Sequence, residues 1–158
     1  MNNHSEAIEA LNDLIQVNFD RIEGYERAIV EMKESNNDIT ASLFEQYVKS
    51  SQNNVETLSE YVVEFGGTPA DSPSLGGKVH RFWMEVRNTF AIHEKESILE
   101  SCIFGDAAAI KFYEAALADT TNNFPIGVTT ALNVQLLAIK ATHAANVAYE
   151  KTLEAMHV

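Results

Sequence analysis

Apolar residues recur along this chain every three to four positions, which is the spacing of an α-helix, through four segments. The segments cover residues 5–35, 40–65 and 79–117, and a fourth begins near 127–130. Clusters of Asn, Asp, Thr, Gly and Pro separate them, and these residues favour turns. No segment shows the alternation of a strand, and the chain has no internal repeat. The pattern therefore predicts an all-α fold, a single four-helix bundle over residues 1–158.

The connections predict how the helices run. Short connections should make the first two helices one antiparallel hairpin and the last two another. Residues 66–78 could extend roughly 43 Å at ~3.3 Å per residue, and a bundle helix at ~1.5 Å per residue is about 40 Å long. This segment is thus either a long crossover or a loose loop of an up-down-up-down bundle. The third segment is longer than its partners, so its first part is expected to bend away or to pack across one end.

Each predicted helix carries a polar residue near the middle of its apolar seam. These residues are Asn18, Ser51, Asp106 and His143, with Asn54 at the edge of the stripe. An unpaired buried polar group costs about 1–3 kcal/mol, so we expect these side chains to pair. Folding the first hairpin brings Asn18 level with Asn54 or Ser51, and folding the second brings His143 within a turn of Asp106. We interpret them as a polar core layer that fixes helix register, with a metal or catalytic centre as the alternative.

Charge and cysteine content limit the classes of binding partner and the cellular compartment that suit this chain. The net charge of −12, from 23 acidic and 11 basic residues, repels phosphate backbones and anionic lipids, so nucleic acid and membrane are excluded as partners. The single cysteine, Cys102, allows no intrachain disulfide and suits a reducing compartment. The N-terminus lacks the basic start and apolar stretch of a signal peptide, and no window reaches the ~18 apolar residues of a membrane span. We predict an acidic, cytoplasmic protein.

A di-iron centre in a helical bundle would need more ligands than the seams offer. Such centres take a Glu from each of two helices and a Glu-x-x-His motif from each of the other two. Glu154 with His157 is the one match to that motif in the sequence, and it lies in the last turn, where helices fray. We therefore predict no catalytic residue, no cofactor and no metal site. Candidates for a single weakly bound iron or zinc ion are His143, Asp106 and Glu100.

Several motifs resemble, in their order, an uncharacterised bacterial family of ferritin-like four-helix-bundle proteins, a domain of unknown function. They are the runs at 11–29, 65–69 (FGGTP), 80–83 (HRFW), 105–109 (GDAAA) and 135–143. The resemblance covers nearly the whole chain. It implies a ferritin-like fold, without an established activity.

Compared with the rubrerythrin-like di-iron pattern, this chain resembles a degenerate version. The corresponding positions hold Asn18, Ser51, Asn54, Asp106, Lys140 and His143. Only Asp106 and His143 keep a ligating side chain, and Lys140 would place a positive charge where a cation should sit. This puts a ferroxidase activity in doubt.

The leading hypothesis is a non-enzymatic structural or protein-interaction bundle that forms a homodimer and is stress-associated, as ferritin-like proteins often are. The alternative is a metal-binding or redox protein with a reduced site at Asp106 and His143. The cluster at 80–83 is either an anchor for a protein partner or packing over one end of the bundle.

Overall fold

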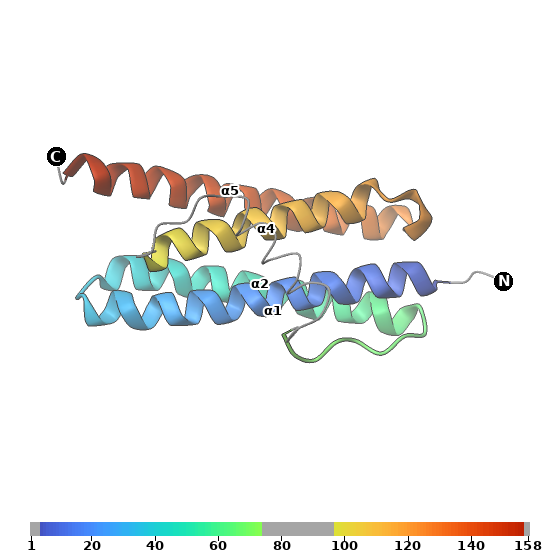
Figure 1. Cartoon of the computed structure of the whole chain (residues 1–158). Coiled ribbons are helices and arrows are strands. Elements are labelled where there is room, and N and C mark those ends of the chain that lie inside the picture. The colour runs from blue at the N-terminus through green and yellow to red at the C-terminus, as the bar shows by residue number, and fades with distance from the viewer. Residues whose placement is uncertain (1–3, 74–96, 157–158) are drawn as a thin grey trace.

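The computed structural model describes residues 4–73 and 97–156, and these fold into four long helices and one short turn of 3-10 helix (Figure 1). The elements are α1 (Ser5–Glu34), α2 (Asp38–Glu64), α4 (Ile98–Ala118), η1 (Thr120–Asn122) and α5 (Ile126–Met156). No strand occurs in the described residues, and the predicted all-α bundle is confirmed. The predicted start of the third helix at residue 79 and the cluster at 80–83 lie outside them. No helix of the described part is long and apolar enough to cross a membrane.

Side-chain caps and left-handed residues set the helix boundaries. The Asn37 side chain accepts a hydrogen bond from the Thr40 backbone N–H at 3.2 Å, so α2 begins at Asp38, two residues before the start at residue 40 that the sequence predicted. Ser97 caps α4 by accepting from the Glu100 N–H at 3.1 Å. After α2 the chain turns through Gly66, whose φ of +89° is a conformation that glycine adopts without a Cβ clash.

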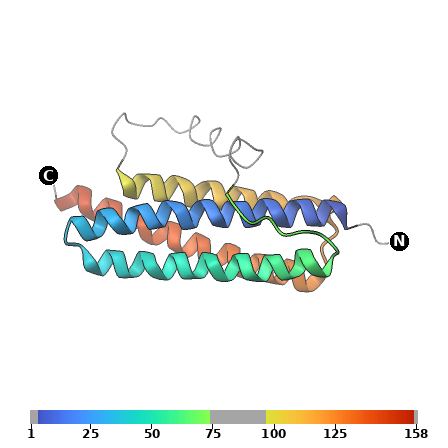
Figure 2. The same ribbon diagram turned by 90° about the horizontal axis from the view of Figure 1, so that it is seen from below.

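The direction of the helices decides between the two topologies that the sequence left open. α1 and α2 are antiparallel, as are α4 and α5, whereas α2 and α4 run in the same direction (Figures 1 and 2). The chain between α2 and α4 therefore connects opposite ends of the bundle, which makes it a crossover connection. Asn12 on α1 holds its beginning, because its side chain donates to Thr68 O at 3.1 Å and accepts from Ala70 N at 2.8 Å.

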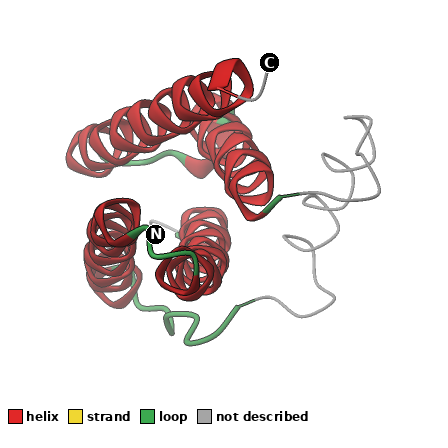
Figure 3. Ribbon diagram, turned by 90° about the vertical axis from the view of Figure 1, so that its left-hand side faces the viewer, coloured by secondary structure: helices red, strands yellow, loops and turns green. Residues whose placement is uncertain are grey.

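The helices pack as two pairs, α1 with α2 and α4 with α5 (Figure 3). Two apolar clusters fill the space between them. One is built around Leu11, Leu14, Ile15, Leu58, Tyr113 and Leu132, and the other around Tyr25, Ala28, Phe44, Val48, Leu99 and Cys102. α1 contributes residues 11–17 to the first cluster and residues 25 and 28 to the second, so the core between them is formed at residues 18–21 of α1. That stretch is where the buried polar side chains gather.

Candidate functional site

A buried ion pair between Arg21 of α1 and Asp106 of α4 lies at the centre of the bundle. The Nε of Arg21 donates to Asp106 Oδ1 at 2.8 Å, and its Nη1 donates to Ser51 Oγ on α2 at 2.7 Å. The hydroxyl of Tyr25 donates to the second oxygen, Oδ2, at 2.5 Å. Asp106 is 0% exposed and Arg21 is 6% exposed. Both carboxylate oxygens are thus matched by donors, which is the condition under which a buried charge is tolerated.

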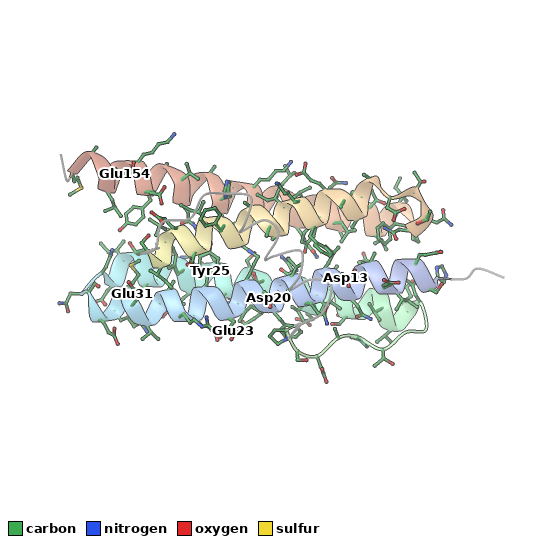
Figure 4. The ribbon with its side chains drawn as sticks, in the orientation of Figure 1. Asp13, Asp20, Glu23, Tyr25, Glu31 and Glu154 are labelled. Carbon is green, nitrogen blue, oxygen red and sulfur yellow. The ribbon has the colours of Figure 1, made fainter. Side chains whose placement is uncertain are left out.

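Tyr25 connects this pair to the fourth helix. It lies on the side of α1 that faces α4 (Figure 4), and its hydroxyl accepts a hydrogen bond from Asn146 Nδ2 on α5 at 2.8 Å. The Arg21 guanidinium carbon is 5.6 Å from the centroid of the Tyr25 ring, a cation–π contact that further stabilises the buried guanidinium. The ion pair and its hydrogen bonds therefore join all four long helices.

A second chain of hydrogen bonds runs through Asn18, one turn before Arg21. Asn18 Nδ2 donates to Leu14 O and to the Tyr113 hydroxyl, both at 2.8 Å, and Asn18 Oδ1 accepts from Asn54 Nδ2 at 3.0 Å. The Tyr113 hydroxyl donates to Gln135 Oε1 at 2.6 Å. Asn18 and Tyr113 are both 0% exposed. Because every one of these groups has a partner, the layer does not carry the cost of stranded polar atoms.

The electrostatics of the layer favour one fixed protonation state. Burial lowers the pKa of Arg21, but the charge of Asp106, its hydrogen bond and the neighbouring hydroxyls of Tyr25 and Tyr113 together raise it by more, so the net result is a pKa above the ordinary value. Burial, followed by the charge of Asp106, raises the pKa of the Tyr25 hydroxyl. Burial likewise raises the pKa of Tyr113. Tyr25 and Tyr113 are thus neutral donors, and the guanidinium and carboxylate cancel each other's charge.

Spacing along α1 explains why these side chains meet. Asn18, Arg21 and Tyr25 are separated by three and four residues, so they project from one face of the helix. Arg21 is not among the polar residues predicted from the sequence, because charged residues are rarely buried, although its position between Asn18 and Tyr25 on one helix face is a signal for it. Gln135 and Asn146 are also not among the residues predicted for the polar layer, because His143 is the polar residue that the sequence predicts for this helix.

The structure brings together Asn18, Ser51, Asn54 and Asp106 of the expected polar layer, and Asn18 does face Asn54. The expected pairing of His143 with Asp106 is wrong, because Arg21 and Tyr25 take the two carboxylate oxygens. Near His143 the buried positions of α5 are Ile139, Thr142 and Asn146, so His143 lies at the edge of the buried face, one residue and about 100° from Thr142. It is half-buried, and its Nδ1 has no hydrogen-bond partner.

Lys140 and the acidic candidates also lie away from the centre. Lys140 is on the surface, where its Nζ is 3.8 Å from Glu114 Oε2, so the expectation that it places a charge in the site is wrong. The buried cation is Arg21 instead. Glu100 lies in the first turn of α4. The pKa of Glu150 on α5 is raised first by burial and second by the negative charge of Glu100. Glu154 is exposed near the end of α5 (Figure 4), and its motif partner at 157 is outside the described residues.

Comparison with solved structures shows the class of fold. The chain is similar to the Rhodobacter capsulatus bacterioferritin described with a metal-free dinuclear site and haem iron, at 13% identity, covering 98% of this chain and 89% of that one, with a TM-score of 0.78. It is also similar to a Bacillus anthracis structure described among ferritin-like, diiron-carboxylate proteins, at 17% identity, 99% coverage of both chains and a TM-score of 0.58. The fold is therefore that of a ferritin-like four-helix bundle.

The sequence family is also identified. Residues 6–119 match the family described as a domain of unknown function (DUF2383), and the chain belongs to this family. This agrees with the resemblance seen in the sequence motifs. No curated protein matches the sequence.

The side chains at the centre do not fit a di-iron site. Two iron ions in a bundle need several carboxylates and two imidazoles, whereas this layer offers one carboxylate, Asp106, already bonded to Arg21 and Tyr25. The guanidinium itself is a fixed positive charge at the place where a metal would have to bind. Among residues 4–73 and 97–156, no three His, Cys, Asp or Glu side chains are grouped so that they could hold a metal ion.

Proposed function

We propose that this chain is a non-enzymatic structural or protein-interaction bundle whose core is held by an internal ion pair in place of metal ions. The observation that carries the proposal is the Arg21 guanidinium, buried to 6% exposure and bonded to Asp106 and Ser51. A metal ion at this position would have to displace a charge that is already hydrogen-bonded on two sides. The layer gives the four helices one register, since a shift along any helix would separate matched polar groups.

The absence of a free ligand also argues against redox chemistry at the centre. Among the described residues, the central layer contains one carboxylate, Asp106, and its oxygens already accept from Arg21 and Tyr25 rather than being available to offset the charge of iron in a low-dielectric core. Tyr25 and Tyr113 are held as neutral hydrogen-bond donors by burial and by their partners. We therefore propose that the bundle acts through its surface, as a scaffold or a binding partner, in the cytoplasm and under stress conditions. The buried, single Cys102 accords with a reducing compartment.

A metal-binding function with a reduced site is the second candidate, and one observation favours it. The Nδ1 atom of His143 is buried and has no hydrogen-bond partner, and an imidazole nitrogen is an acceptable ligand for zinc or iron. Asp106, the other ligand of such a site, would first have to leave Arg21 and Tyr25. Any ion bound by His143 would be held by few ligands, and chelators would remove it easily.

Elemental analysis combined with aerobic addition of iron(II) tests the proposal. We expect substoichiometric metal after purification and iron oxidation no faster than in buffer. The His143→Ala variant is the matched control, because it removes the imidazole and leaves the ion pair intact. Two tightly held irons per chain, or rapid dioxygen-dependent oxidation that His143→Ala abolishes, would overturn the proposal.

We also propose that the chain associates as a homodimer. The support is an apolar face on the outside of α5, where Val134 and Leu137 are exposed and which no other part of residues 4–73 and 97–156 covers.

A further inference from the structure

The outward face of α5 is apolar although it is exposed to solvent. Val134 is 62% exposed and Leu137 is 66% exposed. The same face continues through exposed alanines at positions 138, 141, 144, 145 and 148. Positions 134, 137, 141, 144 and 148 follow the alternation of three and four that a helix uses to pack against another helix at a shallow angle. This seam lies opposite the buried one at Leu132, Ile139 and Asn146, so α5 has two apolar faces, of which the described helices cover one.

Three uncharged polar residues around this face direct their hydrogen bonds back into their own helix. Thr130 Oγ1 donates to Ile126 O at 2.9 Å, and Thr152 Oγ1 donates to Ala148 O at 3.0 Å, at the two ends of the face. At its margin, Asn133 Nδ2 donates to Thr129 O at 2.9 Å. Because these donors have intrahelical acceptors, the face can be removed from water without stranding them.

Charge distinguishes this face from the rest of the surface. No residue of the seam is charged, whereas the molecule as a whole carries −12. The outer side of α1 carries Glu23, which is 51% exposed and pairs with Arg27, together with other acidic residues (Figure 4). Two copies of so acidic a protein repel each other over most approaches. The α5 face is one on which a second copy can be accommodated without placing acidic groups in contact.

We propose that this face binds a second copy of the chain, with the two α5 helices antiparallel about a two-fold axis at Ala141. The side chains on the two sides of Ala141 differ in size in a self-complementary way. Val134 and Ala148 each lie seven residues from Ala141, on opposite sides of it. Leu137 and Ala145 each lie four residues from it, again on opposite sides. An antiparallel pair therefore places each large side chain of one copy against a small one of the other, and both ends pack.

This inference rests on the homodimer proposed above, not on the metal-free core. The test is the mass of the full-length chain by sedimentation equilibrium across the micromolar range, for Ala141→Glu and for Gln52→Glu as a control. Ala141→Glu brings two like charges together at the axis, and we expect it to weaken the dimer at least about tenfold. Gln52→Glu adds the same charge on the exposed side of α2 and should leave the dimer unchanged. Added salt should strengthen the wild-type dimer, because it screens the repulsion between acidic faces.

Cysteine pairs test the antiparallel register separately. A short thiol cross-linker should join Ala141→Cys chains to one another, and should join Val134→Cys to Ala148→Cys only when the two are mixed. Wild type is the control, because Cys102 is buried and its burial raises the pKa of its thiol to about 12. A monomer at every concentration would overturn both the homodimer and this interface. A dimer that Ala141→Glu leaves intact, or Val134→Cys chains that cross-link with themselves as well as with Ala148→Cys, would overturn the interface alone.

Discussion

Replacing Arg21 with Met removes the buried cation and keeps much of the apolar stem. Asp106 then loses the Nε donor at 2.8 Å, and Ser51 loses the Nη1 donor at 2.7 Å. Removing one partner of a buried ion pair costs about 3–5 kcal/mol, because the other charge stays buried without compensation. With a urea m-value of about 2 kcal/mol/M for a domain of this size, the midpoint of unfolding should fall by about 2 M. Far-ultraviolet circular dichroism during urea titration measures it.

The double variant Arg21→Met with Asp106→Asn separates the ion pair from general packing. Asp106→Asn alone strands the guanidinium and should also cost about 3–5 kcal/mol. In the double variant no charge is stranded, and the asparagine oxygen can still accept from the Tyr25 hydroxyl. The loss should then be about 1–2 kcal/mol, the scale of the hydrogen bonds removed. The sum of the stability losses in the two single variants would thus greatly exceed the loss in the double variant. The difference is a coupling free energy of several kcal/mol between the two residues.

The pH dependence of Arg21→Met provides a second signature. In this variant the stranded carboxylate is relieved by protonation, so the deficit in the free energy of unfolding should shrink as the pH falls. A variant that lost stability only through packing would keep the same deficit at every pH. Additive losses in the double variant, or a loss below about 1 kcal/mol for Arg21→Met, would refute the ion-pair account.

Two further predictions follow from single residues. The pKa of Asp20 is raised by burial, and then by the charge of Glu23, from 3.8 to about 6. The native state thus holds this proton more tightly than the unfolded state, and stability should fall as pH rises through that window. Asp20→Asn should flatten this slope in urea midpoints, and an unchanged slope would contradict the assignment. Tyr113→Phe deprives Asn18 and Gln135 of a partner and should cost about 1–3 kcal/mol. Tyr61 lies outside this network and serves as the control. An equal loss of stability in Tyr113→Phe and in Tyr61→Phe would contradict a role of the Tyr113 hydroxyl in the network.

The sequence predicted α1 well because its outer face is charged. Glu23, Glu26 and Arg27 mark the solvent side, which fixes the phase of the seam through Asn18 and Tyr25. Periodicity could not reveal Arg21, since a long charged residue beside a seam is usually at the surface with its stem packed. Its burial depends on Asp106, which is distant in the sequence and approaches only in the folded bundle.

For α5 the pattern predicted His143 in the core where the structure buries Thr142, and the physical reason is the second apolar face of this helix. With Val134 and Leu137 outside and Leu132 and Ile139 inside, hydrophobicity hardly distinguishes the two sides. A rotation by one residue was enough to put His143 into the predicted core in place of Thr142. The crossover was undecidable for another reason, because the length of residues 66–78 suits both topologies.

The most direct test of the central claim is the free energy of unfolding measured anaerobically with and without iron(II). A ligand that binds the native state alone stabilises it by RT ln(1 + [L]/Kd), about 2.7 kcal/mol at one hundred times Kd. If the Arg21–Asp106 pair occupies the place of a metal, wild type should unfold at the same urea midpoint in chelator and in excess iron(II). A midpoint that rises with iron concentration, and does so less in Asp106→Asn, would show that the core binds iron and would contradict the account.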